Sequence, residues 1–286
     1  MLFHKPDSAD LAALSAWATV LPGASASEDY AHDEMTEYGA FAPDALALCE
    51  SAEGVAKVLG YCAQKNIAVT PRGAGTGLCG GAVPIHGGVV LSLERMNHIL
   101  EIDENTMTAT VEPGVLLSDF IREVEARGLF YPPDPGEKTG SIGGNVVTNA
   151  GGMRAVKYGT TRDYVLAATV VLPSGEVLEL GRAVTKTSSG YSLLHLVIGS
   201  EGTLAIVTEI TLKLIARPEA STSFILPFAD IDAAIASVPG IKLAGLDPQS
   251  IEFMERDIVV DAEEHTGNHV FPAEVEGQQA NAYILI

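Results

Sequence analysis

The hydrophobic positions of the first hundred residues alternate between short apolar runs and one stretch with helical periodicity, which is typical of a small α/β lobe. We expect strands at three apolar runs, residues 45–49, 67–70 and 89–93. One helix face is formed by apolar residues at i, i+3, i+4 and i+7, namely Val55, Val58, Leu59 and Cys62. Ser51 precedes them and can cap the helix. The pattern predicts a helix packed on strands, with a glycine-rich connection between the last two strands.

A second lobe follows from about residue 104, beginning with a strand near 108–111. A helix is expected at about 118–127, and Gly128 is well placed to end it. Two further strands are expected to flank a turn at Pro173-Ser174-Gly175-Glu176, at residues 165–172 and 177–180. Residues 205–215 alternate along another strand. These elements predict an α+β domain with lobes at about 41–103 and 104–217.

The two ends of the chain carry their own patterns. Apolar residues recur at helical spacing from Leu11 to Leu21, so we expect residues 1–40 to form an N-terminal helical segment that docks on the domain. A domain exit is expected at Arg217-Pro218-Glu219, followed by a strand at 222–227 and a helix at 231–238. The chain stops in an apolar strand at 282–286, which would leave an exposed sheet edge. We therefore expect residues 218–286 to be an incomplete domain, in a chain that is truncated or naturally short.

Composition narrows the function classes. The 286 residues carry a formal net charge of −20, which argues against nucleic acid and anionic membranes as partners, because both need basic patches. No apolar run is long enough to span a bilayer, and Asp7 and Asp10 stand where a signal peptide would carry basic residues. The three cysteines form no disulfide framework and suit a reducing compartment. We expect a cytoplasmic protein, or one peripheral to the inner membrane through a partner.

Residues 71–82, Pro-Arg-Gly-Ala-Gly-Thr-Gly-Leu-Cys-Gly-Gly-Ala, are the most informative stretch of the chain. Glycines let successive N–H groups converge on one point, and such concave rows of amides bind phosphate oxygens. Arg72 adds a positive charge that we expect at the mouth of the loop. The stretch predicts a pyrophosphate cradle for a nucleotide cofactor. The alternative is that these glycines only build a wide turn between two strands.

The loop formally matches the dinucleotide motif Gly-x-Gly-x-x-Gly at Gly75, Gly77 and Gly80. A Rossmann loop must open directly into a helix, whereas residues 80–88 are too short and broken for one, and a strand follows. The P-loop is also excluded, because no Gly-Lys-Ser/Thr follows. A second glycine-rich segment, residues 140–152, again mixes glycine with short donors and favours a ligand gripped between two lobes.

Five motifs occur in one order along the chain: the 71–81 loop, Pro132-Pro133-Asp134-Pro135, residues 140–152, Tyr158-Gly159 and residues 198–204. Together they resemble the FAD-binding domain of the FAD-linked oxidases, which share the vanillyl-alcohol oxidase or PCMH-type fold. Within that family the glycolate oxidase D-subunit and D-lactate dehydrogenase branch is most similar. The resemblance covers about residues 10–217. It implies a two-lobed PCMH-type FAD-binding domain at 41–217, then an incomplete α+β substrate or cap domain at 218–286.

The resemblance also implies the flavin contacts. Pyrophosphate is expected on the first loop at Arg72, Gly73, Ala74, Gly75, Thr76, Gly77, Leu78 and Gly81. Ser141, Gly144 and Asn145 are expected to meet it from the second lobe, with Asn149 and Gly151 close to the flavin ring. Glu201, Gly202 and Ile206 would lie along the adenosine or the ring flank. Ala205 and Ser192 depart from the commoner family residues, but neither replaces a direct donor.

Non-covalent FAD is expected. Covalent members of the superfamily place a histidine in the cradle where this chain has Thr76. Cys79 lies in the cradle, and we interpret it as a small buried thiol that fills space. His265 and His269 have the spacing of a metal pair, but Thr266-Gly267-Asn268 between them predicts a turn and solvated histidines. We therefore expect no metal site. In the resembling branch the histidines that supply base and ligands lie beyond residue 286, so no catalytic residue is assigned.

The leading hypothesis is an FAD-dependent dehydrogenase or oxidase that transfers hydride from a 2-hydroxy acid of the D-lactate or glycolate type to the flavin. Because the cap is expected to be incomplete, this chain alone should be weakly active or inactive. The alternative is a non-catalytic flavin-carrying subunit of a hetero-oligomeric electron-transfer complex, with an acceptor protein or subunit as its partner. A sugar-nucleotide reductase on the same fold would need an NADPH-handling region, which nothing after residue 217 suggests.

Overall fold

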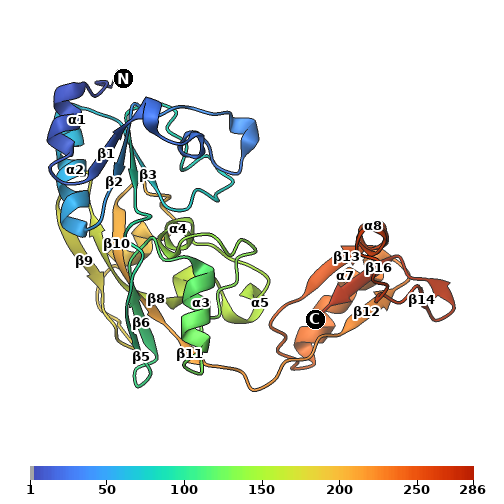
Figure 1. Ribbon diagram of the computed structural model, residues 1–286. Helices are drawn as coiled ribbons and strands as arrows, with labels where there is room; N and C mark the ends of the chain where they lie inside the picture. Colours follow the sequence, from blue (N-terminus) through green and yellow to red (C-terminus); the bar gives the residue numbers. More distant parts are fainter. Residues whose placement is uncertain (1–2) are drawn as a thin grey trace. The chain divides into compact units, whose positions relative to one another are not determined.

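The computed structural model of the protein describes residues 3–286, apart from the side chain at position 36, and divides them into two units (Figure 1). The first unit comprises residues 3–131, Glu137–Ala150 and Thr161–Arg217. The second comprises Pro132–Gly136, Gly151–Thr160 and Pro218–Ile286. Two short segments of the middle of the chain therefore group with the C-terminal region. The domain boundaries expected from the sequence stay a prediction.

One sheet of the first unit is built on parallel neighbours. Its strands, in order across the sheet, are β1 (Thr19–Pro22), β2 (Ala45–Leu48), β4 (Val89–Ser92) and β3 (Val69–Arg72). β4 pairs in parallel with β2 and β3, while β1 is antiparallel to β2. The three strands expected from the apolar runs are confirmed, with β3 starting two residues later than predicted. The glycine-rich connection therefore begins at the carboxyl end of the edge strand β3.

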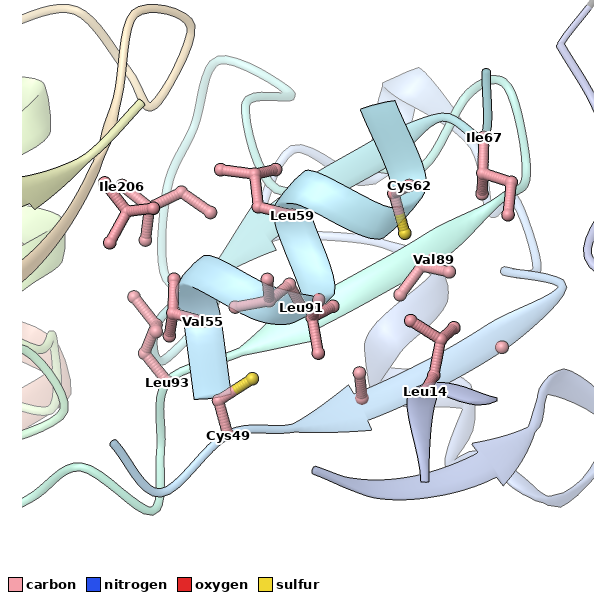
Figure 2. Packing of buried hydrophobic residues seen from close by; sticks show 14 of the residues in the cluster. Leu14, Cys49, Val55, Leu59, Cys62, Ile67, Val89, Leu91, Leu93 and Ile206 are labelled. Atoms are coloured by element: carbon pink, nitrogen blue, oxygen red, sulfur yellow. The ribbon is translucent and has the colours of Figure 1, made fainter. Parts of the chain in front are cut away.

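Helix α2 (Ala52–Lys65) covers one face of this sheet. Its predicted cap is confirmed, because Ser51 Oγ accepts a hydrogen bond from Gly54 N at 3.1 Å. The apolar side chains of α2 face those of β4, as the labelled Val55, Leu59, Val89 and Leu91 show (Figure 2). The same buried cluster includes residues of β8 and β10 from the second sheet. α2 thus packs between the two sheets and fixes the strand from which the loop leaves.

The second sheet of this unit is antiparallel throughout. Its strands, in order, are β5 (Ile99–Asp103), β6 (Thr108–Val111), β10 (Ile206–Lys213), β8 (Val165–Val171) and β9 (Val177–Gly181). The predicted hairpin is confirmed, since β8 and β9 pair across residues 172–176. The helices of this region are α3 (Leu117–Glu125), α4 (Ile142–Thr148), α6 (Leu193–Val197) and the 3₁₀ turn Thr161–Tyr164. A short ladder joins β7 (Leu129–Phe130) to β11 (Ile215–Ala216).

The expected N-terminal helix through Leu21 is wrong. Helix α1 spans only Ser8–Leu14, and Thr19–Pro22 forms β1. The physical reason is the side-chain period: Val20 packs into the cluster beneath α2, whereas Leu21 packs into a cluster on the opposite face of the sheet. Pairing with β2 also satisfies backbone groups that a free helix end would expose. Three short 3₁₀ turns follow, Gly23–Ser25, Glu28–Ala31 and Thr36–Tyr38.

The second unit contains a three-stranded antiparallel sheet, in the order β12 (Ile225–Phe228), β16 (Ala282–Leu285) and β13 (Glu252–Glu255). Its helices are α5 (Ala155–Tyr158), α7 (Ile231–Leu243) and α8 (Arg256–Thr266). A small hairpin joins β14 (Glu274–Val275) and β15 (Gln278–Gln279). The expected exposed edge at the last strand is wrong, because β16 is central and pairs on both sides.

Candidate functional site

The glycine-rich loop leaves β3 with its amides free. Among the described residues, the backbone N–H groups of 73–79 donate to no acceptor. Gly75 and Gly80 have φ values of 79° and 76°, a region that only glycine adopts at low cost. A Cβ on Gly75 would overlap the Arg72 guanidinium directly beneath it. Free amides on a tightly turned loop are the chemistry that binds an anionic oxygen.

Arg72 does not lie at the mouth of the loop, contrary to the sequence-based expectation. Only 6% of its surface is exposed, and Nη1 donates to His32 O at 2.7 Å and to Ala82 O at 3.4 Å. Burial lowers the pKa of the guanidinium from its ordinary value, an effect opposed by Tyr30 and Asp33 nearby. The cation therefore supports the loop from within, because its forked donors satisfy backbone carbonyls.

The second glycine-rich segment packs against the first at the start of α4. A Cβ on Gly73 would overlap Ser141 Oγ, so only glycine fits there. A Cβ on Gly140 would lie 3.3 Å from Thr76 Oγ1 and 3.4 Å from Asn145 Oδ1. The structure thus brings the predicted residues of both loops together.

The amides at the start of α4 are already used. Ile142 N donates to Val115 O, Gly143 N to Pro113 O, and Gly144 N to Ser141 Oγ at 3.2 Å. Asn145 Nδ2 is different: it is buried and has no hydrogen-bond partner in the described chain. A buried donor without a partner is costly. Asn145 is therefore the side chain that this segment offers to a ligand.

A third segment, residues 199–202, lies beside the C-terminal end of α4. Glu201 N donates to Val147 O at 2.8 Å, and a Cβ on Gly81 would lie 3.2 Å from Glu201 Oε2. A Cβ on Gly202 would contact Pro71 Cγ at 2.7 Å. Ser200 Oγ is buried without a partner in the described chain. The predicted Glu201 and Gly202 thus adjoin the first loop.

An apolar cavity of about 430 Å³ adjoins the same strand. Pro71 and Gly202 line it, so it starts where the first and third segments touch. Ile206, predicted to lie along the adenosine or the ring flank, also lines it. The rest of the lining comes from α2, from residues 67–70, 85–86, 203 and 205, and from Phe3 and Pro173. The cavity can take a flat, weakly polar group joined to an anion on the loop.

That Asn149 and Gly151 lie close to the flavin ring stays a prediction. Asn149 ends α4 with φ 50°, and its Oδ1 accepts from Arg162 N at 2.9 Å. Gly151 belongs to the second unit. Sequence reasoning missed Ser200 and Asp33, the second of which accepts from Gly80 N at 2.8 Å. Ser200 lies inside a recognised motif, but no periodicity marks either residue.

The structure also places the cysteines and the two C-terminal histidines that the sequence analysis considered. Cys49 and Cys62 are buried, which raises the pKa of each thiol to about 12. The expectation that Cys79 is a buried thiol is wrong: Cys79 is exposed, because residues 77–79 of the loop lie at the surface. The break predicted between the two C-terminal histidines is confirmed at Gly267, which ends α8 with φ 71°. The expectation that both histidines lie in a loop is wrong for His265, because α8 continues through Thr266. Within the described part of the chain, no three His, Cys, Asp or Glu side chains are placed to hold a metal ion. No helix among the described residues has the length and apolar character needed to cross a membrane.

Comparison with known proteins decides the family. A model of the FAD binding domain matches residues 43–181, and a model of the FAD linked oxidases' C-terminal domain matches residues 217–286. The chain belongs to the FAD-linked oxidases. FAD, the cofactor expected from the sequence, is therefore confirmed. Non-covalent attachment stays a prediction.

Two curated proteins are similar to this chain. A D-lactate dehydrogenase of Anaerostipes hadrus is 53% identical over 266 residues, which are 93% of this chain and 56% of that protein. The glycolate oxidase subunit GlcD of Bacillus subtilis is 43% identical over 237 residues, 82% of this chain and 50% of that protein. The chain thus spans about half the length of the curated relatives it matches.

Solved structures show the fold of this FAD-linked oxidase. An alkyldihydroxyacetonephosphate synthase superposes with a TM-score of 0.71 at 23% identity, over 85% of this chain and 48% of that one. The 6-hydroxy-D-nicotine oxidase of Arthrobacter nicotinovorans gives 0.64 at 22% identity, over 94% and 54%. The predicted α+β fold of PCMH type is confirmed.

Proposed function

We propose that the first unit holds FAD with its pyrophosphate on the amides of residues 73–79. The observation that carries this proposal is that these amides have no acceptor in the described chain and lie beside Asn145, whose buried Nδ2 also lacks one. Pyrophosphate oxygens would accept from both. Gly73, Ser141 and Gly144 then contribute to the site through their small size, because they let the two loops approach closely.

The adenosine half of FAD is assigned to the apolar cavity beside Pro71 and Gly202. Adenine presents two apolar faces and needs no charged partner, which suits this lining. The cavity adjoins the loop, so one dinucleotide can occupy both. Thr76 offers no nitrogen or sulfur for a bond to the flavin, which supports non-covalent attachment.

The substrate class is proposed from the relatives' names. Besides the D-lactate dehydrogenase and glycolate oxidase subunit, a D-2-hydroxyglutarate dehydrogenase of Xanthomonas citri is 46% identical over 212 residues. The acids in these names all carry a hydroxyl on the carbon next to a carboxylate. Bound FAD would supply the acceptor for the hydride that leaves this carbon. This chain's described residues would hold the cofactor; they provide no assigned base.

The experiment is reconstitution of the apoprotein with FAD, followed by anaerobic addition of D-lactate, glycolate or D-2-hydroxyglutarate. Tight binding and full release of unmodified FAD on acid precipitation are expected. Slow loss of the visible flavin absorbance with at least one of these acids, and none with acetate, supports the dehydrogenase. If FAD binds but no acid bleaches it, this chain holds FAD without oxidising these acids by itself. If FAD does not bind, the proposed site is wrong.

A further inference from the structure

Residues 28–34, here called the acidic segment, lie across the glycine-rich loop. Glu34 N donates to Gly77 O at 3.0 Å, and Arg72 Nη1 donates to His32 O at 2.7 Å. The Arg72 guanidinium also lies 5.5 Å from the ring centroid of Tyr30. The acidic segment is therefore bonded to the loop at its beginning and at its middle.

Asp33 makes the contact with the far part of the loop. It is only 2% exposed, its Oδ2 accepts from Gly80 N at 2.8 Å, and its Oδ1 accepts from Met35 N at 3.0 Å. A carboxylate beside an anion-binding loop is unfavourable by charge alone. Its two oxygens are, however, engaged by amides that lie outside the free row of residues 73–79. Asp33 can therefore hold the loop without occupying the amides that face a ligand.

The outer end of the acidic segment is also anchored. Tyr30 Oη donates to Glu94 Oε2 at 2.6 Å, just after β4. Burial and this bond raise the pKa of Tyr30 to about 12, so the hydroxyl keeps its proton at neutral pH. These contacts of the acidic segment matter because the backbone N–H groups of residues 73–79 donate no hydrogen bond within the described chain. Without external contacts its free amides would not stay aligned.

We propose that Asp33 is a positioning residue that fixes the glycine-rich loop in its anion-accepting conformation. This inference rests on the proposed FAD site and adds to it a group that touches no part of the cofactor. The carboxylate acts through Gly80 N, and the Tyr30–Glu94 bond holds the segment that carries it. Loss of either contact should weaken binding of the pyrophosphate and leave binding of the flavin ring unaffected.

The test compares Asp33→Asn with Asp44→Asn as a matched control. Asp44 Oδ2 accepts from Gly88 N at 2.6 Å, so it makes the same kind of bond to the same β3–β4 connection, but at the end away from the free amides. Dissociation constants are measured for FAD, ADP and riboflavin, with the thermal midpoint of each apoprotein. We expect Asp33→Asn to weaken FAD and ADP about tenfold or more, because it removes a charge-assisted bond, with riboflavin unchanged. Asp44→Asn should lower the thermal midpoint and keep wild-type affinities.

A milder variant, Tyr30→Phe, keeps the ring on Arg72 and removes the hydroxyl, which bonds to Glu94 and also interacts with Ser92. Tyr30→Phe should weaken FAD and ADP binding less than Asp33→Asn does. It replaces Asp33→Asn in the test if that variant does not fold. Equal weakening of FAD and riboflavin, or equal effects of the two Asp variants on FAD, would overturn the positioning role. FAD affinity unchanged in both Asp33→Asn and Tyr30→Phe would also overturn it. Wild-type protein that binds no FAD would instead refute the proposed site itself.

Discussion

Asn145 carries a buried side-chain amide whose Nδ2 donates to nothing in the described chain. A native protein keeps few such groups, because each one left unsatisfied costs about 1–3 kcal/mol. The neighbouring Thr76 and Gly140 place this donor beside the free loop amides. Asn145 Nδ2 is a buried donor that costs stability, and it lies next to a row of free backbone amides. This combination indicates a ligand-binding position.

The variant Asn145→Ala should therefore affect stability and binding in opposite directions. The free energy of unfolding of the apoprotein should stay the same or rise, since an unsatisfied donor is removed. FAD affinity should fall about tenfold or more, because hydrogen bonds to charged groups contribute about 1.5–3 kcal/mol. Chemical denaturation and quenching of flavin fluorescence measure the two effects.

Asn281→Ala provides the matched control, because Asn281 Nδ2 donates to Ala229 O at 2.8 Å in the second unit. This variant should lose stability and keep wild-type FAD affinity. If Asn145→Ala bound FAD as well as the wild type, Asn145 would not be a ligand-binding residue.

The elements show where sequence patterns suffice and where they do not. The strands around α2 and the β8–β9 hairpin were predictable, since apolar period and turn residues mark them. Residues 11–21 were mispredicted because Leu14 and Leu21 fit a helical face, while Val20 and Leu21 also fit the two faces of a strand. Only pairing with β2 decides between them. Likewise, Arg72 lies beneath the loop and not at its mouth because its guanidinium donates to His32 O. His32 is forty residues away in sequence, so no local pattern reveals this contact.

Helix α1 is attached to α2 by a buried carboxylate. Asp10 Oδ1 accepts from Tyr61 Oη at 2.7 Å, and Asp10 Oδ2 lies 2.7 Å from His4 Nε2. The backbone N–H of Asp7, the Tyr61 hydroxyl and His4 hold the pKa of Asp10 well below its ordinary value of 3.8. The stability that a depressed carboxyl pKa provides is present above the unfolded-state value and is lost as pH falls through the folded-state value.

Asp10→Asn should accordingly lower the thermal midpoint by a constant amount between pH 5 and 8. The difference from the wild type should shrink as the pH falls below about 4, where Asp10 of the unfolded chain becomes protonated. Tyr61→Phe, which removes only one of the bonds, should show a smaller difference with the same pH profile. A difference that did not diminish in acid would contradict this account of the contact.

The whole molecule is strongly acidic, with a net charge of −20. Its proposed pyrophosphate site presents neutral amides, and the Arg72 cation next to them is buried close to Asp33, Asp29 and Glu94. Binding of an anionic dinucleotide therefore occurs against the overall field of the protein. Sites that rely on exposed lysine and arginine show the opposite arrangement and lose affinity as salt screens the attraction.

FAD affinity should therefore rise slightly, or stay level, as sodium chloride increases from about 0.01 to about 0.15 M, because salt screens repulsion over distances beyond the Debye length. Riboflavin, which carries no phosphate, should show no dependence. Titrations at several salt concentrations measure both. An FAD affinity that dropped steeply with salt would indicate a cationic site in place of the amide row.

Hydrogen–deuterium exchange of peptides that cover residues 73–79 tests the central claim most directly, because it reports on the amides themselves. In the apoprotein these N–H groups meet no acceptor among the residues that the structure describes, so they should exchange rapidly. Saturating FAD should slow their exchange strongly, ADP should slow it as well, and riboflavin should not. If FAD bound with full occupancy while this loop exchanged as fast as before, the pyrophosphate would lie elsewhere and the account would be contradicted.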